Sequence, residues 1–273
     1  QQYFLTSASV QNIIRADMAV YRNIETLPDK VAIHINDTHP ALVIPELMRI
    51  LMDEYFLSWE KAWDITVRTV SYTNHTVMPE ALEKWSEDIF GLKLPRIHMI
   101  VKEINERFSR EAWNAYPGNW NRIAGMSILS YGQVNMANLA VVGSHSVNGV
   151  SKLHGWVSQK MFAPIWKGYY PEENHVGYVT NGVHFPTWTA TEWRKLYDSY
   201  FDDNFLYDQS NERIWHAIYD VPDEEIWETR MALKKKLVKY IRDKFTQQWL
   251  RNQGDPAKVM SIIQRITPNA LMI

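Results

Sequence analysis

Hydrophobic residues along this chain follow patterns that predict strands and helices in alternation. Residues 31–35 and 70–73 are dominated by apolar side chains, as in strands buried in a parallel sheet. Helical spacing and helix start signals predict helices over residues 1–21, 40–54, 59–69, 79–90, 95–115 and 150–161. Residues 133–142 form a short apolar run whose period does not distinguish strand from helix, and we interpret it as a helix. A short apolar segment at residues 176–180 predicts one more strand. This alternation indicates an α/β layered fold.

The pattern changes after residue 188, where long helices replace the alternation. Pro222 and the acidic residues that follow it predict the start of a long helix, because proline and acids favour a first helical turn. We interpret the lysines at positions 234–244 as the solvated face of that helix. We therefore expect two domains, an α/β part at residues 1–188 and a helical part at residues 189–273.

The composition of the chain argues against several classes of function. The chain has 273 residues, 46% of them hydrophobic, which is enough for a buried core. A net charge of -2 offers no basic surplus for nucleic acid or an anionic membrane surface. Cys is absent, which excludes disulfides and thiolate metal sites and fits a cytoplasmic location. We find no signal peptide or membrane-spanning run, and the first residue, Gln1, suggests an internal fragment.

Polar clusters follow the first two predicted strands. Asp37 and His39 come directly after the first, and Asn74, His75 and Thr76 end the second. Ligands of open α/β sheets bind at the carboxyl ends of strands, so these clusters belong at a candidate site. Amide, imidazole and carboxylate groups can hold the hydroxyls of a sugar, whereas two ligands in one loop are no metal site. The alternative is that these side chains cap helices or satisfy loop backbone.

Several sequence motifs, taken in their order along the chain, resemble those of one family, the α-glucan (glycogen, starch and maltodextrin) phosphorylases. They are NDTHP at residues 36–40, IPELMR at 44–49, YTNHT at 72–76, PEALE at 79–83, GSHSVNGV at 143–150 and TNGV at 180–183. The resemblance is dense up to about residue 188 and thin afterwards. Residues 183–188 read VHFPTW, unlike the basic run of animal-type members, and look more like the divergent bacterial and archaeal branch.

The resemblance implies a fold and a reaction. The family has two Rossmann-like domains in the glycosyltransferase-B arrangement, so this helix-rich α/β fragment would hold the later part of the N-terminal domain and the opening of the C-terminal cofactor domain. The implied reaction is retaining phosphorolysis of terminal α-1,4-linked glucose by inorganic phosphate, which yields glucose 1-phosphate. The implied cofactor is pyridoxal 5'-phosphate, attached to a lysine outside this chain, with no metal. Full-length members tend to form homodimers.

Motif by motif, the resemblance also assigns roles. His75 would bind the 6-hydroxyl of the transferred glucosyl unit, with its backbone carbonyl facing the charge that develops at C1. Asp37 would help to order the same catalytic region. The remaining residues expected to contact substrate are His39, Asn74, Thr76, Glu80, Ala81, Glu83 and Asn181.

Two other functions stay open at this point. The chain could be a glucan-binding module without chemistry, or part of a nucleotide-sugar glycosyltransferase of the same architecture. The glycines of residues 143–150 do not form GxGxxG after a strand, so a dinucleotide fingerprint is not supported. By resemblance this segment borders the catalytic cleft, although His145 could equally be a structural cap.

Overall fold

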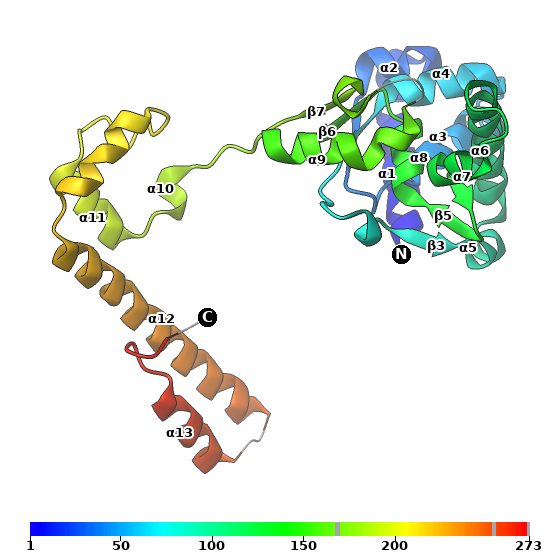
Figure 1. Ribbon diagram of the computed structural model, residues 1–273. Helices are drawn as coiled ribbons and strands as arrows, with labels where there is room; N and C mark the ends of the chain where they lie inside the picture. Colours follow the sequence, from blue (N-terminus) through cyan, green and yellow to red (C-terminus); the bar gives the residue numbers. More distant parts are fainter. Residues whose placement is uncertain (167–169, 253–254, 272–273) are drawn as a thin grey trace. The chain divides into compact units, whose positions relative to one another are not determined.

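The chain folds into two compact units, Gln1–Asn181 and Gly182–Ile273, which we call unit 1 and unit 2. The computed structural model describes residues 1–166, 170–252 and 255–271 (Figure 1). The first unit ends at Asn181, so the short helix α10 (Phe185–Trp188) belongs to unit 2. The assignment of residues 1–188 and 189–273 to two domains stays a prediction.

Unit 1 combines strands and helices. Its strands are β1 (Ile33–Asn36), β2 (Val70–Thr73), β3 (Lys84–Ser86), β4 (Leu129–Ser130), β5 (Gln133–Asn135), β6 (Ser146–Gly149) and β7 (Val176–Tyr178). Its α-helices are α1 (Gln2–Tyr21), α2 (Leu27–Lys30), α3 (Val43–Asp53), α4 (Trp59–Thr69), α5 (Glu87–Lys93), α6 (Pro95–Ala115), α7 (Trp120–Met126), α8 (Met136–Val142) and α9 (Lys152–Phe162). Short 3₁₀ turns are η1 (Ile24–Thr26), η2 (Pro79–Ala81), η3 (Ala163–Ile165) and η4 (Pro171–Glu173).

A parallel sheet in the order β1-β2-β6-β7 forms the centre of unit 1. Its register aligns four buried apolar side chains in one row across the strands, Ile35, Tyr72, Val147 and Val176. Successive strand residues point to opposite faces, so the next row faces the other way. That row is polar: Asn36, Thr73, Asn148 and Gly177. The predicted α/β fold with a parallel sheet is confirmed.

A second, antiparallel sheet in the order β3-β5-β4 corrects two predictions. The helix predicted over residues 79–90 is wrong, because this stretch forms η2, β3 and the start of α5. The helix predicted over residues 133–142 is confirmed only from Met136, since its first three residues form β5. Trp85 pairs with Val134 across the sheet, and this distant partner overrides the local helical spacing.

A buried carboxylate joins α1 to α3. Glu46 is fully buried and accepts hydrogen bonds from the Tyr3 hydroxyl at 2.8 Å and the Ser7 hydroxyl at 2.7 Å. Arg49, one turn further along α3, donates to both of its oxygens at 2.9 and 3.0 Å. Burial raises the pKa of Glu46, but these hydrogen bonds outweigh burial and hold the pKa below its usual value. The charge is thus compensated, and α1 is secured beside the helix that follows β1.

Unit 2 is helical. Its elements are α10, α11 (Thr191–Tyr200), η5 (Glu212–Asp220), α12 (Asp223–Arg251) and α13 (Pro256–Arg265). Aromatic rings from Phe185, Tyr197, Phe201, Phe205 and Trp215 contact one another and form its apolar centre. The long helix α12 begins as predicted, and α13 folds back beside it (Figure 1). Among the described residues of both units, every helix is too short or too polar to cross a membrane.

Candidate functional site

The loop after β1 is shaped by its first residue. Asp37 has a left-handed backbone with φ of 64°, a conformation that aspartate tolerates better than most residues. Its backbone N–H still donates to the Thr73 carbonyl at 3.0 Å, and its side chain accepts from the Thr38 N–H at 2.8 Å. The chain therefore turns sharply at the carboxyl end of β1. Burial raises the pKa of the Tyr72 hydroxyl, and the charge of Asp37 adds to this rise.

His75 lies in the neighbouring loop, after β2. Its side chain is exposed, and its Nε2 lies 2.6 Å from Oδ1 of Asn36, the last residue of β1. Because β1 and β2 are adjacent and parallel, their carboxyl ends bring the two loops together. The clusters that follow separate strands in the sequence thus lie together at one end of the sheet, where they form a candidate site.

Asn74 holds the His75 loop in place through the hydrogen bonds of its side-chain amide. Its side chain is fully buried, and its Oδ1 accepts from the Tyr72 hydroxyl at 3.2 Å and from the Thr76 N–H at 3.1 Å. Its Nδ2 donates to the Thr76 carbonyl at 2.9 Å and to the Ser158 hydroxyl at 3.0 Å. All four hydrogen-bonding positions of the amide are therefore used inside the protein. This geometry favours a positioning role over the direct substrate contact that the sequence suggested.

Helix α9 makes a second contact with the same loop through His154. His154 is buried, and its Nε2 lies 2.9 Å from the Thr76 carbonyl, while its Nδ1 accepts from the Val150 N–H at 3.1 Å. The ring fits here because α9 passes very close to the end of β6. A Cβ on Gly149 would lie 2.8 Å from both the Gly155 nitrogen and the His154 ring. Gly149 therefore permits the close approach that fixes Thr76.

Glu83 ties the β1 loop to the small sheet. Its carboxylate accepts from the Thr38 hydroxyl at 2.6 Å, from the Trp85 indole at 2.9 Å and from the Gln2 amide at 3.1 Å. Partial burial raises the pKa of Glu83, but these hydrogen bonds and the nearby His39 lower it by more, so the pKa lies below its usual value. Glu83 is thus a charged residue at the edge of the site, and it links the β1 loop to β3 through hydrogen bonds.

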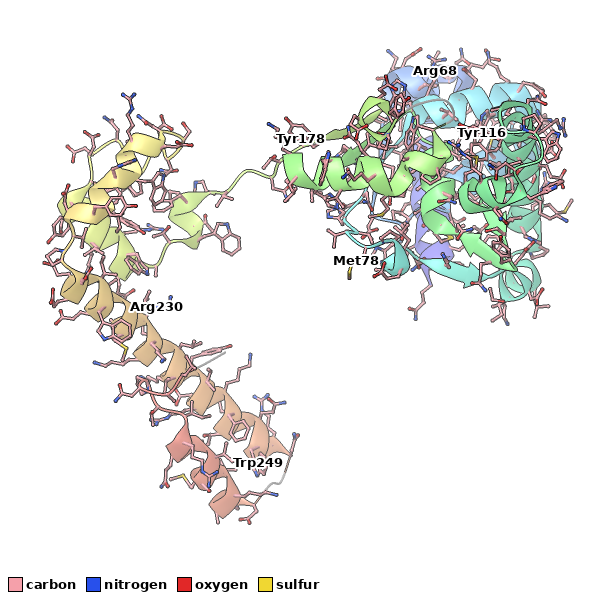
Figure 2. All side chains as sticks on the ribbon, in the orientation of Figure 1. Arg68, Met78, Tyr116, Tyr178, Arg230 and Trp249 are labelled. Atoms are coloured by element: carbon pink, nitrogen blue, oxygen red, sulfur yellow. The ribbon has the colours of Figure 1, made fainter. Side chains whose placement is uncertain are left out.

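The other predicted contact residues lie in the segments that follow β1, β2 and β7. His39, Glu80, Ala81 and Asn181 are exposed, and Thr76 is half-buried. Asn181 comes shortly after the end of β7 and closes unit 1. Figure 2 labels Met78, after the β2 loop, and Tyr178, at the end of β7, and both side chains are about half exposed. Polar groups that suit a hydroxyl-rich ligand therefore remain open to solvent here.

His145 belongs to the opposite end of the sheet. It precedes β6, its backbone N–H donates to the Val70 carbonyl at 3.0 Å, and its Nδ1 lies 3.1 Å from the Val67 carbonyl. It also borders a cavity of about 680 Å³ between α4 and α6, whose walls include Trp59 and Arg107. Of the two interpretations of His145, the structure supports the structural one. In the segment of residues 143–150, the end that lies toward the candidate site is the one at Asn148 and Gly149.

Sequence reasoning missed β6 and three of the residues that hold the site. The segment SVNG has few apolar residues and ends in glycine, so it does not look like a strand. Asn36 is the first residue of the NDTHP motif. Its position directly after the predicted strand was the signal that could have marked it, and in the structure it ends β1. His154 and Ser158 lie on α9 and contact the loop over long sequence separations, so no local pattern marks them.

Comparisons with known proteins find relatives over most of this chain. A model of the family described as carbohydrate phosphorylase matches residues 1–253. Glycogen phosphorylase of Bacillus subtilis (strain 168) is 50% identical over 188 residues, which cover 69% of this chain and 23% of that protein. The muscle forms of glycogen phosphorylase from Ovis aries and Homo sapiens are each 45% identical over 200 residues, with the same coverage. The chain thus spans 23% of the length of these relatives. It belongs to the carbohydrate phosphorylase family.

Proposed function

We propose that the protein containing this chain is an α-glucan phosphorylase, a glycosyltransferase that cleaves terminal α-1,4-linked glucose with inorganic phosphate. In this reaction the bond from C1 to the glucan oxygen breaks, and a bond from C1 to a phosphate oxygen forms with retention. A proton passes from the inorganic phosphate to the departing oxygen, and glucose 1-phosphate is released. The observation that carries the proposal is the family match together with a polar site at the carboxyl ends of β1 and β2.

The residues of the site would have different roles in this reaction. His75 is exposed and available to a sugar hydroxyl, and its backbone carbonyl would face the charge that develops at C1. Asp37 would order the same region. The exposed or half-buried side chains expected to line the glucose pocket are His39, Thr76, Glu80, Ala81, Glu83 and Asn181. Asn74 would act by holding the loop, because its amide is fully occupied.

The family also implies pyridoxal 5'-phosphate, which supplies a phosphate group for proton exchange when bound. Attachment requires a lysine whose amine becomes uncharged in a shielded pocket. The lysines of α12 do not fit this requirement. Lys234 donates to the Ala270 carbonyl at 2.6 Å, and Lys236 is exposed and paired with Glu192. In line with the family resemblance, we place the attachment lysine in a part of the protein outside this chain, and we expect a cytoplasmic homodimer.

His75→Ala in the full-length protein tests the proposal. Release of glucose 1-phosphate from maltoheptaose and phosphate should fall about 100-fold, the scale seen when one group that stabilises transition-state charge is lost. His145→Ala is the matched control, because His145 lies at the other end of the sheet, and its activity should stay near that of the unmodified protein. Equal activity of His75→Ala and the unmodified enzyme would refute the role of His75.

Two further measurements separate the remaining alternatives. The isolated chain of residues 1–273 should release no glucose 1-phosphate, because it lacks the attachment lysine. A full-length protein that binds maltoheptaose but never forms glucose 1-phosphate would instead be a glucan-binding module. Transfer from a nucleotide sugar in place of phosphorolysis would indicate a glycosyltransferase of the nucleotide-sugar type.

A further inference from the structure

The ring of His75 is held by a residue on the neighbouring strand. Asn36 ends β1, and its Oδ1 lies 2.6 Å from Nε2 of His75. The backbone of Asn36 is paired with Thr73 in the parallel sheet, and the next residue, Asp37, donates to the Thr73 carbonyl. The acceptor is therefore fixed to the sheet, whereas His75 itself lies in a loop.

This contact has a chemical consequence for the imidazole. An amide oxygen only accepts hydrogen bonds, so the Nε2 that faces it must carry the hydrogen. In a neutral imidazole the other nitrogen, Nδ1, is then an acceptor. An amide is also uncharged, so Asn36 adds no charge of its own beside the ring. Asn36 thus selects one tautomer of His75 without adding a charge to the site.

We propose that Asn36 is the positioning residue for His75, and that it presents Nδ1 as a hydrogen-bond acceptor to a hydroxyl of the bound sugar. This inference rests on the proposed function. A hydroxyl that donates to Nδ1 is held in one orientation, and a neutral ring adds no positive charge beside the carbon where positive charge develops. The arrangement follows the general rule that a functional histidine is oriented through its second nitrogen.

The tautomer can be measured without reference to activity. In the full-length protein with ¹⁵N-labelled histidine, two-bond ¹⁵N–¹H correlation spectra distinguish a protonated from an unprotonated ring nitrogen. The His75 signals are identified by their loss in His75→Ala. We expect Nε2 protonated and Nδ1 unprotonated in the unmodified protein. A protonated Nδ1 in the unmodified protein would mean that the amide faces His75 with its NH₂ group, and would overturn the inference.

Kinetics test whether Asn36 acts through His75. Asn36→Leu removes the acceptor at similar size, and kcat/KM for phosphorolysis should fall about tenfold, as when the partner that orients a functional histidine is lost. In a His75→Ala background the same substitution should have no further effect. Asn36→Ala is a second variant with the same expectation, for the case that the leucine does not fold. Asn114→Leu, at an exposed asparagine of α6, is the control and should retain full activity.

The outcomes distinguish this inference from the function on which it rests. If His75→Ala itself leaves phosphorolysis intact, the proposed role of His75 fails. If His75→Ala lowers activity while both Asn36 variants match the unmodified enzyme, only the role of Asn36 fails. Effects of the two substitutions that simply multiply would likewise refute it, because Asn36 would then act independently of His75.

Discussion

Asn74 offers the sharpest test of how this site is held together. Asn74→Ala would remove an amide that is fully buried and makes four hydrogen bonds, at 2.9, 3.0, 3.1 and 3.2 Å. Two donors would lose their acceptor, the hydroxyl of fully buried Tyr72 and the N–H of Thr76. The Thr76 carbonyl would keep its contact with His154.

The magnitude follows from these groups. A buried donor without a partner costs about 1–3 kcal/mol. The Tyr72 hydroxyl should contribute most of that range, and the Thr76 N–H less, because Thr76 is only half-buried. We therefore expect Asn74→Ala to lower the free energy of unfolding by about 3 kcal/mol. Ser158→Ala removes only one of the four hydrogen bonds and should cost about 1 kcal/mol.

Unfolding in urea, followed by tryptophan fluorescence, measures both variants against the unmodified protein. Phosphorolysis by the full-length Asn74→Ala protein should fall as well, because the loop that carries His75 loses its anchor. If Asn74→Ala were no less stable than Ser158→Ala, the buried amide would not be what holds the loop, and the reasoning would be refuted.

Three other predictions concern packing and charge in unit 1. Gly149→Ala should lower the free energy of unfolding by about 1–3 kcal/mol, since its Cβ would lie 2.8 Å from the backbone of α9, whereas Gly177→Ala on the next strand meets nothing within 4 Å and should be close to neutral. Thermal melting of the two variants checks this, and equal melting temperatures would contradict it. Arg49→Met should cost about 3 kcal/mol, because it leaves the buried carboxylate of Glu46 without its cation. The pKa of Glu46 is lowered in the folded state, so its contribution to stability is present above its ordinary pKa and is lost as pH falls. Glu46→Gln should flatten the acid side of the stability profile, and an unchanged profile would count against this assignment.

Local patterns in the sequence determined much of this protein. The alternation of strands and helices in unit 1, the start of α12 at Asp223 and the polar clusters after β1 and β2 all depend on side-chain spacing and turn chemistry within a few residues. The motif phrases around His75 then indicated the family. These features could be predicted because the forces that set them act between near neighbours in the chain.

Only the tertiary structure decided which of these residues act together. The polar segment SVNG becomes strand β6 because it pairs with β2 and β7, and Lys84–Ser86 becomes β3 through pairing with Gln133–Asn135. Asn74 holds the loop because its buried amide donates a hydrogen bond to Ser158 on α9, which lies far along the chain. The contact between Asn36 and His75 likewise depends on two strands lying side by side. Such partners are chosen by long-range packing and hydrogen-bond satisfaction, which leave no periodic trace in the sequence.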